Sequence, residues 1–171
     1  MQPVAFFDRD GTLIEDQVYQ FELSRLTWQP GAIESLKLLN SSGWKIVVVT
    51  NQSAVARGIC TEADVDAFHQ NMKAEAARWG AVIDTFEYCP FLPDAPILRY
   101  RVANHPDRKP NPGMIVRHLP SSPLACARSF LVGDKLSDIA AANAAGIPAF
   151  LYIPGSNLLE VVNRAMLSTG L

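Results

Sequence analysis

Short apolar runs alternate with helix-like segments along the whole chain. The apolar runs, several of them rich in β-branched residues, predict strands at 4–7, 44–49, 82–88, 130–132 and 149–153. Apolar residues at helical spacing predict helices at 32–39, 61–79, 112–119, 139–145 and 158–166. Strands that are apolar on both faces and alternate with helices are typical of a parallel sheet covered on both sides. The pattern therefore predicts a Rossmann-like, doubly wound α/β fold.

Residues at the ends of the predicted helices support these boundaries. Thr61 and Asp64 have the spacing of an N-terminal capping pair at the start of the longest helix. Gly43 follows the helix at 32–39 and is a plausible C-cap. His69 and His118 fall on predicted helices, and we expect them to be surface groups rather than catalysts.

Polar residues gather where the predicted strands end. Asp8 and Asp10 follow the first strand, Thr50 and Asn51 the second, and Asp134 the fourth. In open α/β sheets the carboxyl ends of the strands form the ligand crevice. We therefore expect these residues to meet at one edge of the sheet.

The first of these clusters reads Asp8-Arg9-Asp10-Gly11-Thr12. Two carboxylates this close repel each other in a dry site, and a divalent cation with hard oxygen ligands, such as Mg²⁺, removes that repulsion. One Asp can attack phosphorus as a nucleophile, and the other can act as the general acid and base. Gly11 allows a sharp turn after the strand. The alternative is an acidic turn that caps a helix or binds calcium.

A second cluster, Thr50-Asn51-Gln52, follows the second strand. A hydroxyl and backbone amides at a strand-to-helix turn suit phosphate oxygens, although the same residues are also ordinary turn formers. Arg57 lies shortly after this cluster and could reach a substrate phosphate. Alternatively, it is a solvated surface arginine.

A third cluster is Arg108-Lys109-Pro110. Lys109 can neutralise the charge of a phosphoryl group and position a nucleophilic carboxylate. Arg108 offers a planar fork for a second anionic group. A basic loop without a catalytic role is the alternative.

The fourth cluster extends from Gly133-Asp134-Lys135 to Asp138. Asp134 can complete a magnesium site with the first cluster. Asp138 can contribute to that site directly or through water. It can equally be a carboxylate favoured by the dipole at a helix N-terminus.

Composition narrows the classes of function. A chain of 171 residues with 49% hydrophobic residues is long enough for one domain, 1–171, with a sizeable core. A net charge of -2 without a basic run argues against nucleic-acid binding. No apolar run is long enough to span a bilayer, and no segment resembles a signal peptide. The odd number of cysteines, three, is simplest to explain as reduced thiols, so we expect a cytoplasmic monomer.

Together the four clusters resemble the haloacid dehalogenase (HAD) superfamily, in its order of motifs and over the whole chain. The resemblance implies Asp8 as nucleophile, Asp10 as acid and base, and Thr50 and Lys109 as holders of the transferring phosphoryl group. It also implies that Asp8, the Asp10 backbone carbonyl and Asp134 hold Mg²⁺. Dehalogenases of the superfamily lack the second acid, so Asp10 indicates phosphatase chemistry. A catalytically silent binding module is the alternative from another class.

A finer resemblance is to the D-glycero-D-manno-heptose 1,7-bisphosphate 7-phosphatases, carried by the Asp-Arg-Asp-Gly-Thr and Arg-Lys-Pro motifs among others. Histidinol-phosphatase domains are similar in the same places, so histidinol phosphate or another small phosphomonoester is the alternative substrate. These enzymes lack a separate cap domain, which implies that the loop at 89–107 sets specificity. We expect the substrate-binding residues to be Asn51, Arg57, Arg108 and Lys135.

The loop departs from the resembled family at its structural zinc site. The family carries Cys-x-His early in the loop and Cys-x-Cys just before Arg-Lys-Pro. Here Cys89 remains, but Phe91 occupies the His position, and His105 and Asp107 occupy the second pair. A structural zinc requires four ligands, so we expect no stoichiometric zinc. We expect an apolar anchor to hold the loop instead, made of Phe91, Leu92, Ile97, Leu98 and Tyr100.

Overall fold

The computed structural model describes residues 2–17 and 26–170, which form one five-stranded parallel sheet of order β3-β2-β1-β4-β5. The strands are β1 (Val4–Phe7), β2 (Lys45–Asn51), β3 (Thr85–Cys89), β4 (Phe130–Gly133) and β5 (Ala149–Leu151). The helices are α1 (Ala32–Ser41), α2 (Ser53–Ala56), α3 (Glu62–Arg78), α4 (Gly113–Val116), α5 (Pro123–Arg128), α6 (Leu136–Ala144) and α7 (Leu158–Ser168), with a 3₁₀ turn η2 at Leu98–Tyr100. The predicted α/β class and parallel sheet are confirmed.

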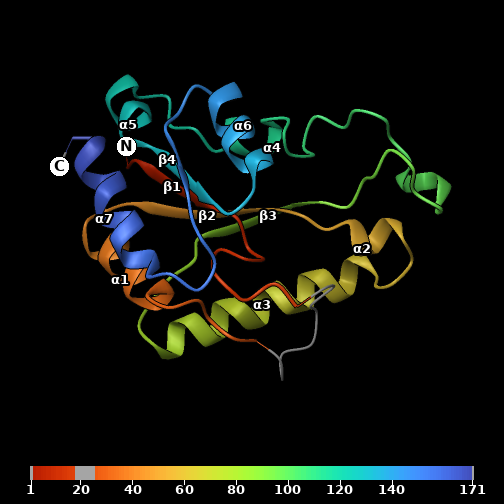
Figure 1. The fold of residues 1–171 in the computed structure, drawn as a ribbon, viewed down its shortest axis with the longest axis horizontal. Helices are drawn as coiled ribbons and strands as arrows, with labels where there is room; N and C mark the ends of the chain where they lie inside the picture. Colours follow the sequence, from red (N-terminus) through yellow and green to blue (C-terminus); the bar gives the residue numbers. More distant parts are fainter. Residues whose placement is uncertain (1, 18–25, 171) are drawn as a thin grey trace.

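Helices cover both faces of the sheet (Figure 1). Helices α1, α3 and α7 lie on one face, and α4, α5 and α6 lie on the other. Each face has its own apolar core, because alternate residues of the buried strands point to opposite sides. Phe7 and Val48 pack toward α1 and α7, whereas Phe6 and Val49 pack toward α4 and α6.

The order of the strands reverses beside β1, and this reversal creates the crevice. The chain runs from β1 through β2 to β3 on one side and then returns to place β4 on the other side of β1. Phe7 pairs in register with both Val48 of β2 and Val132 of β4. The carboxyl ends of the three central strands therefore lie together, as expected for a ligand crevice.

Strand β3 is shorter than the predicted strand at 82–88. The Asn40 side chain bonds to both backbone polar groups of Val82, with distances of 3.1 and 2.7 Å. An Asp84 carboxylate oxygen accepts the backbone N–H of Ile46. Side chains thus replace the sheet ladder here, and the strand begins at Thr85. The sequence pattern also missed α2 and α5, which are too short to show a helical period.

The predicted helix signals are present. Thr61 Oγ1 accepts the backbone N–H of Asp64, and the Asp64 carboxylate accepts that of Thr61, which completes a capping box. Gly43 adopts a φ of 80° just after α1, a conformation that disfavours other residues.

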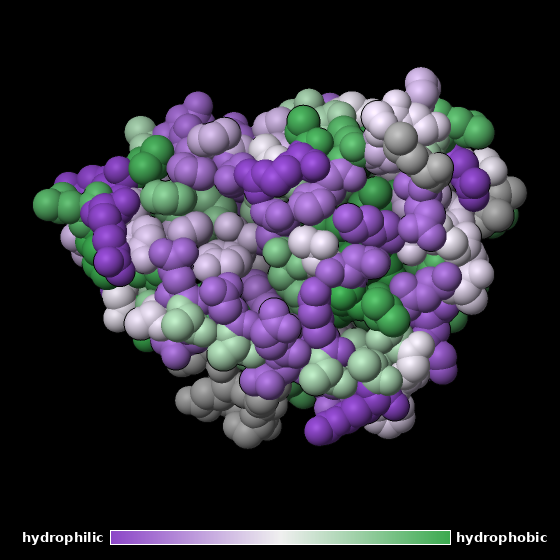
Figure 2. All heavy atoms as spheres, turned by 180° about the vertical axis from the view of Figure 1, so that it is seen from behind, coloured by the Kyte–Doolittle hydropathy of each residue, from purple (hydrophilic) through white to green (hydrophobic). Residues whose placement is uncertain are grey.

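The segment between β3 and α4 extends from one end of the molecule (Figure 1). The corresponding end in Figure 2, seen from behind, carries both hydrophobic and hydrophilic residues. A small apolar cluster that includes Leu92 and Tyr100 anchors the segment against α2 and α3, with Phe91 and Ile97 packed at its margin. Leu98 is 74% exposed, so its assignment to the anchor was wrong. Tyr100 faces inward, and its hydroxyl donates to Glu62.

Within residues 2–17 and 26–170, no helix has the length and apolar character required to cross a membrane.

Candidate active site

A small polar cavity of about 50 Å³ opens where the central strands end. It is lined by Asp8, Asp10, Thr50, Asn51, Lys109, Lys135, Ser137 and Asp138. Clusters that are far apart in the sequence thus meet at one sheet edge, as predicted. A larger cavity of about 640 Å³ is lined mainly by residues of α1, α3 and the segment before α1, and it contains none of the predicted site residues.

Lys109 occupies the buried centre of the site. Its Nζ lies 2.7 Å from Asp8 Oδ1, 2.6 Å from Asp138 Oδ1 and 2.7 Å from the Val49 carbonyl oxygen. Burial alone would lower the pKa of Lys109, but the Asp8 and Asp138 carboxylates outweigh burial and raise it. Lys109 therefore stays charged and links the loop after β1 to the N-terminus of α6.

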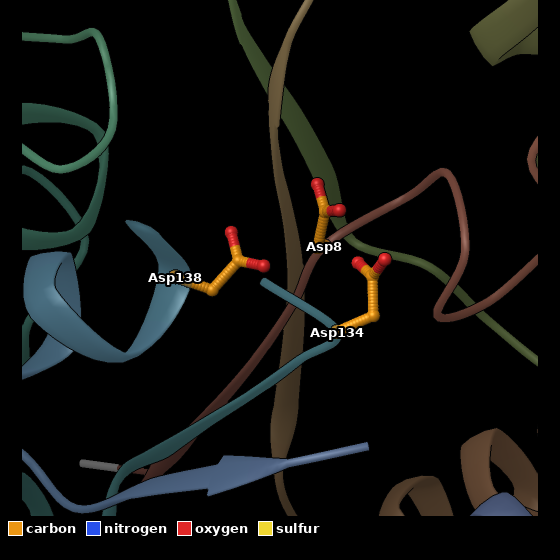
Figure 3. A group of neighbouring side chains, drawn as sticks. All are labelled: Asp8, Asp134 and Asp138. Atoms are coloured by element: carbon orange, nitrogen blue, oxygen red, sulfur yellow. The ribbon is translucent and has the colours of Figure 1, made fainter. Parts of the chain in front are cut away.

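Three carboxylates, those of Asp8, Asp134 and Asp138, are the group of possible metal ligands among the described residues. Each offers an oxygen within 4.8 Å of the others, and Figure 3 shows them turned toward a common space. Burial and the neighbouring charge of Asp8 raise the pKa of Asp134 to about 6. Crowded carboxylates with hard oxygen atoms suit a divalent cation such as Mg²⁺, which would relieve this repulsion.

Two glycines allow the carboxylates to approach the backbone. A Cβ at Gly11, where φ is 85°, would lie 2.5 Å from Asp134 Oδ2. A Cβ at Gly133 would lie 2.4 Å from the Cβ of Asp138. The sharp turn predicted at Gly11 is confirmed, and neither site tolerates a side chain without moving an acid of the cluster.

Asp10 lines the cavity and is held from behind. Arg9 Nε lies 3.0 Å from Asp10 Oδ1, and Arg9 Nη2 lies 2.9 Å from Asp10 Oδ2. Gln52 Nε2 donates to Asp10 Oδ2 and to Thr50 Oγ1, each at 2.9 Å. Gln52 thus couples the first and second motifs.

Asn51 makes a reciprocal pair of bonds with the backbone of Lys109. Its Nδ2 donates to the Lys109 carbonyl, and its Oδ1 accepts the Lys109 N–H, both at 3.0 Å. Asn51 lines the cavity but uses both ends of its amide on this pair. The contact positions Lys109, which the sequence did not indicate.

The predicted substrate-binding cations differ in position. Lys135 lines the cavity and is exposed, with its Nζ 3.4 Å from Asp16 and 3.9 Å from Asp134. Arg108 is half-buried and donates from Nη1 to the Phe91 carbonyl in the 89–107 loop. Arg57 is exposed at the end of α2 and is not among the residues that line the cavity.

Asp138 combines the two predicted environments. Its Oδ2 accepts the backbone N–H of Lys135 at the start of α6, as a carboxylate at a helix N-terminus does. Its other oxygen pairs with Lys109, and the side chain belongs to the carboxylate cluster. The structure therefore supports a helix-capping contact together with a place beside the candidate metal site.

The former zinc positions of the loop have other contacts. Cys89 Sγ lies 3.8 Å from His105 Nδ1, and the Phe91 ring stacks on the His105 ring with centroids 4.1 Å apart. The Asp107 carboxylate pairs with Arg117 at 2.7 Å. These residues do not form a group of three convergent ligands in the described part of the chain.

Sequence reasoning missed a buried layer behind Asp10. Arg9 is 1% exposed and His69 on α3 is 3% exposed, so the assignment of His69 to the surface was wrong. Arg9 Nη1 lies 3.1 Å from His69 Nε2. An arginine next to a buried strand requires acceptors, and this requirement was the available signal. His118 is half-buried and pairs with Glu87, outside the cavity lining.

Comparisons with known proteins agree with this geometry. Residues 107–166 match the family model described as HAD-hydrolase-like. The chain is 42% identical to the D-glycero-β-D-manno-heptose-1,7-bisphosphate 7-phosphatase of Rhodopseudomonas palustris, over 88% of this chain and 83% of the relative. It is 37% identical to the enzyme of the same name from Escherichia coli K12, over 85% of this chain and 75% of the relative.

A solved structure shares the fold. It is a D,D-heptose 1,7-bisphosphate phosphatase from B. bronchiseptica in complex with magnesium and phosphate. The TM-score is 0.77 at 26% identity, covering 98% of this chain and 99% of that one. Sequence identity over most of both chains, with the fold and motif order, shows that this chain is a HAD-superfamily phosphatase and belongs to the D-glycero-D-manno-heptose-1,7-bisphosphate 7-phosphatase family.

Proposed function

We propose that the protein is a magnesium-dependent phosphatase that removes the 7-phosphate of D-glycero-D-manno-heptose 1,7-bisphosphate through a phosphorylated Asp8. One observation carries this proposal. Buried Lys109 joins the Asp8 and Asp138 carboxylates at a small polar cavity, on the edge where Asp10 and Thr50 also lie. The names of the relatives supply the substrate.

In the first half of the reaction, an Asp8 carboxylate oxygen attacks phosphorus and forms an O–P bond. The bond from phosphorus to the sugar oxygen breaks, and Asp10 donates a proton to the departing alkoxide. Lys109 holds Asp8 Oδ1 at 2.7 Å, which fixes the plane of the nucleophile. Its positive charge also offsets the charge that the transferring group brings.

In the second half, Asp10 is a carboxylate and acts as the base. It takes a proton from water, and the water oxygen attacks phosphorus. The bond between phosphorus and Asp8 breaks, which releases inorganic phosphate and restores Asp8. Thr50 and the backbone amides after β2 are placed to hold the phosphoryl oxygens, and Asn51 keeps Lys109 in place.

Asp8, Asp134 and the Asp10 backbone carbonyl are the residues that would hold Mg²⁺, with Asp138 in contact through water. When bound, the ion neutralises phosphoryl charge and orients the group for in-line attack. The crowding of the three carboxylates supports this assignment, as does the magnesium in the related B. bronchiseptica structure.

Selectivity is assigned to the loop at 89–107, because the chain has a single sheet in its described part and the loop flanks the site. Arg108 bonds to this loop at Phe91, so its guanidinium is positioned to meet the non-reacting part of the substrate. Arg57 and Lys135 are the other candidate contacts to that part. Phe91 replaces a polar residue of the family pattern, which keeps histidinol phosphate as the second candidate substrate.

A direct comparison of substrates tests the proposal. We expect kcat/KM for heptose 1,7-bisphosphate to exceed that for histidinol phosphate and for 4-nitrophenyl phosphate, because a second phosphate supplies binding energy that orients the first. Arg108→Ala should reduce kcat/KM for the bisphosphate more than for 4-nitrophenyl phosphate. A preference for histidinol phosphate would replace the proposed substrate, and equal losses in Arg108→Ala would assign Arg108 to the reacting phosphoryl group or to the fold.

A further inference from the structure

Arg9 is a fully buried cation that touches the active site from behind. Its guanidinium meets both oxygens of the Asp10 carboxylate, at 3.0 and 2.9 Å. The face of the guanidinium packs over the Phe68 ring of α3, at 4.9 Å. Because Arg9 is 1% exposed, it cannot contact a substrate in the cavity. Its visible work is on the Asp10 carboxylate.

His69 accepts a hydrogen bond from Arg9. Arg9 Nη1 lies 3.1 Å from His69 Nε2, and an arginine side chain can only donate. His69 Nε2 must therefore carry a lone pair, so the ring is neutral and its proton is on Nδ1. Burial, followed by the charge of Arg9, lowers the pKa of His69 to about 3, which agrees with this assignment. The ring cannot turn easily, because it stacks on Phe86 with centroids 4.3 Å apart.

We propose that Arg9 and His69 are positioning residues that set the orientation of Asp10 from the packed face of α3. The two-pronged contact fixes the plane of the carboxylate, and His69 fixes the guanidinium. The contact favours ionised Asp10, the form that the attack of water requires. Asp10 gains its proton for the first step when the charge of a bound phosphoryl group lies beside it. This inference rests on the acid and base role proposed for Asp10.

The test compares two leaving groups in matched variants. His69→Leu keeps a similar side-chain volume but removes the acceptor, and His69→Gln restores an acceptor. 4-Nitrophenolate departs without a proton, whereas a primary alkoxide needs one from Asp10. Since kcat/KM reports the steps through departure of the leaving group, we expect His69→Leu to lower the ratio of kcat/KM for a primary alkyl phosphate over 4-nitrophenyl phosphate by about tenfold. His69→Gln should keep this ratio within about threefold of wild type.

Asp10→Asn and thermal unfolding provide the controls. Asp10→Asn should lower the ratio further than His69→Leu does. If Asp10→Asn lowers the ratio and His69→Leu does not, the positioning role is overturned while the proposed function stands. If Asp10→Asn leaves the ratio unchanged, the proposed acid role itself fails. A loss in His69→Leu that is equal for both substrates, or that His69→Gln shares, would reduce His69 to a structural role. Should His69→Leu unfold early, Arg9→Lys provides the same ratio, because lysine keeps the charge and loses the fork.

Discussion

The Lys109 ammonium lies 2.7 Å from the Asp8 carboxylate, although 101 positions separate the two residues in the sequence. Both side chains are almost fully buried, so each charge depends on the other for compensation. The pair joins the loop after β1 to the loop before α4, and Asp138 extends it to α6. The site is therefore also part of what holds the carboxyl edge of the sheet together.

The first prediction concerns this pair. Lys109→Met removes the buried cation and leaves two carboxylates without compensation, so we expect the free energy of unfolding to fall by about 3–5 kcal/mol in metal-free buffer. Urea unfolding measures the change. Lys109→Arg is the matched control, because it keeps the charge and should lose less. Equal stability of Lys109→Met and wild type would show that solvent or protonation already compensates these acids.

Magnesium is the subject of the second prediction. Phosphatase activity should disappear with EDTA and return when Mg²⁺ is added, because the carboxylate cluster at Asp8 needs a cation to accept a phosphoryl group. Ca²⁺ should inhibit, since its larger and less regular oxygen shell misplaces the group for in-line attack. Full turnover after exhaustive chelation would contradict the assignment of Asp8 and Asp134 to a metal site.

A third prediction concerns zinc. Elemental analysis of the purified protein should find no stoichiometric zinc, because Phe91 stacks on His105 and Arg117 engages Asp107 at the positions where the family pattern has ligands. Cys89→Ser should then cost little activity, whereas Phe91→Asp should loosen the loop and change substrate preference. One zinc per chain that is lost in Cys89→Ser would overturn this prediction.

The fourth prediction concerns pH. His69 has a pKa of about 3 in the folded protein against an ordinary value of 6.5, so the unfolded chain binds the additional proton between these values. Its contribution to stability is complete above about pH 6.5 and is lost as the pH falls below that value. Relative to His69→Gln, which does not titrate, wild type should lose about 2 kcal/mol more between pH 7 and pH 5. Parallel pH profiles for the two proteins would show that His69 protonates in the folded state.

The strand-end reasoning predicted which motifs meet, because the carboxyl ends of parallel strands share an edge. Asp8, Asp10, Thr50 and Lys109 do line one cavity. The layer behind them was not predictable in this way. Whether His69 faces water or Arg9 depends on the rotation of α3 against the sheet, which packing decides and a one-dimensional pattern does not contain.

The use of side chains on backbone was equally hidden. Asn51 reads as a phosphate-binding residue by its position after β2, yet both ends of its amide bond to the backbone of Lys109. Residues 82–84 read as strand by their apolar content, but Asn40 takes the backbone bonds of Val82. Such pairings join residues distant in sequence, and local propensity does not report them.

The central claim is that Asp8 becomes phosphorylated, and chemical trapping tests it most directly. Asp10→Asn protein, which lacks the base for the second step, is mixed with Mg²⁺ and the sugar bisphosphate, quenched in acid and reduced with borohydride. Borohydride converts an aspartyl phosphate to homoserine, which peptide mass spectrometry locates. We predict homoserine at position 8, dependent on substrate and absent in an Asp8→Asn control. Turnover by wild type without any trapped modification at Asp8, or with modification at another residue, would contradict the mechanism.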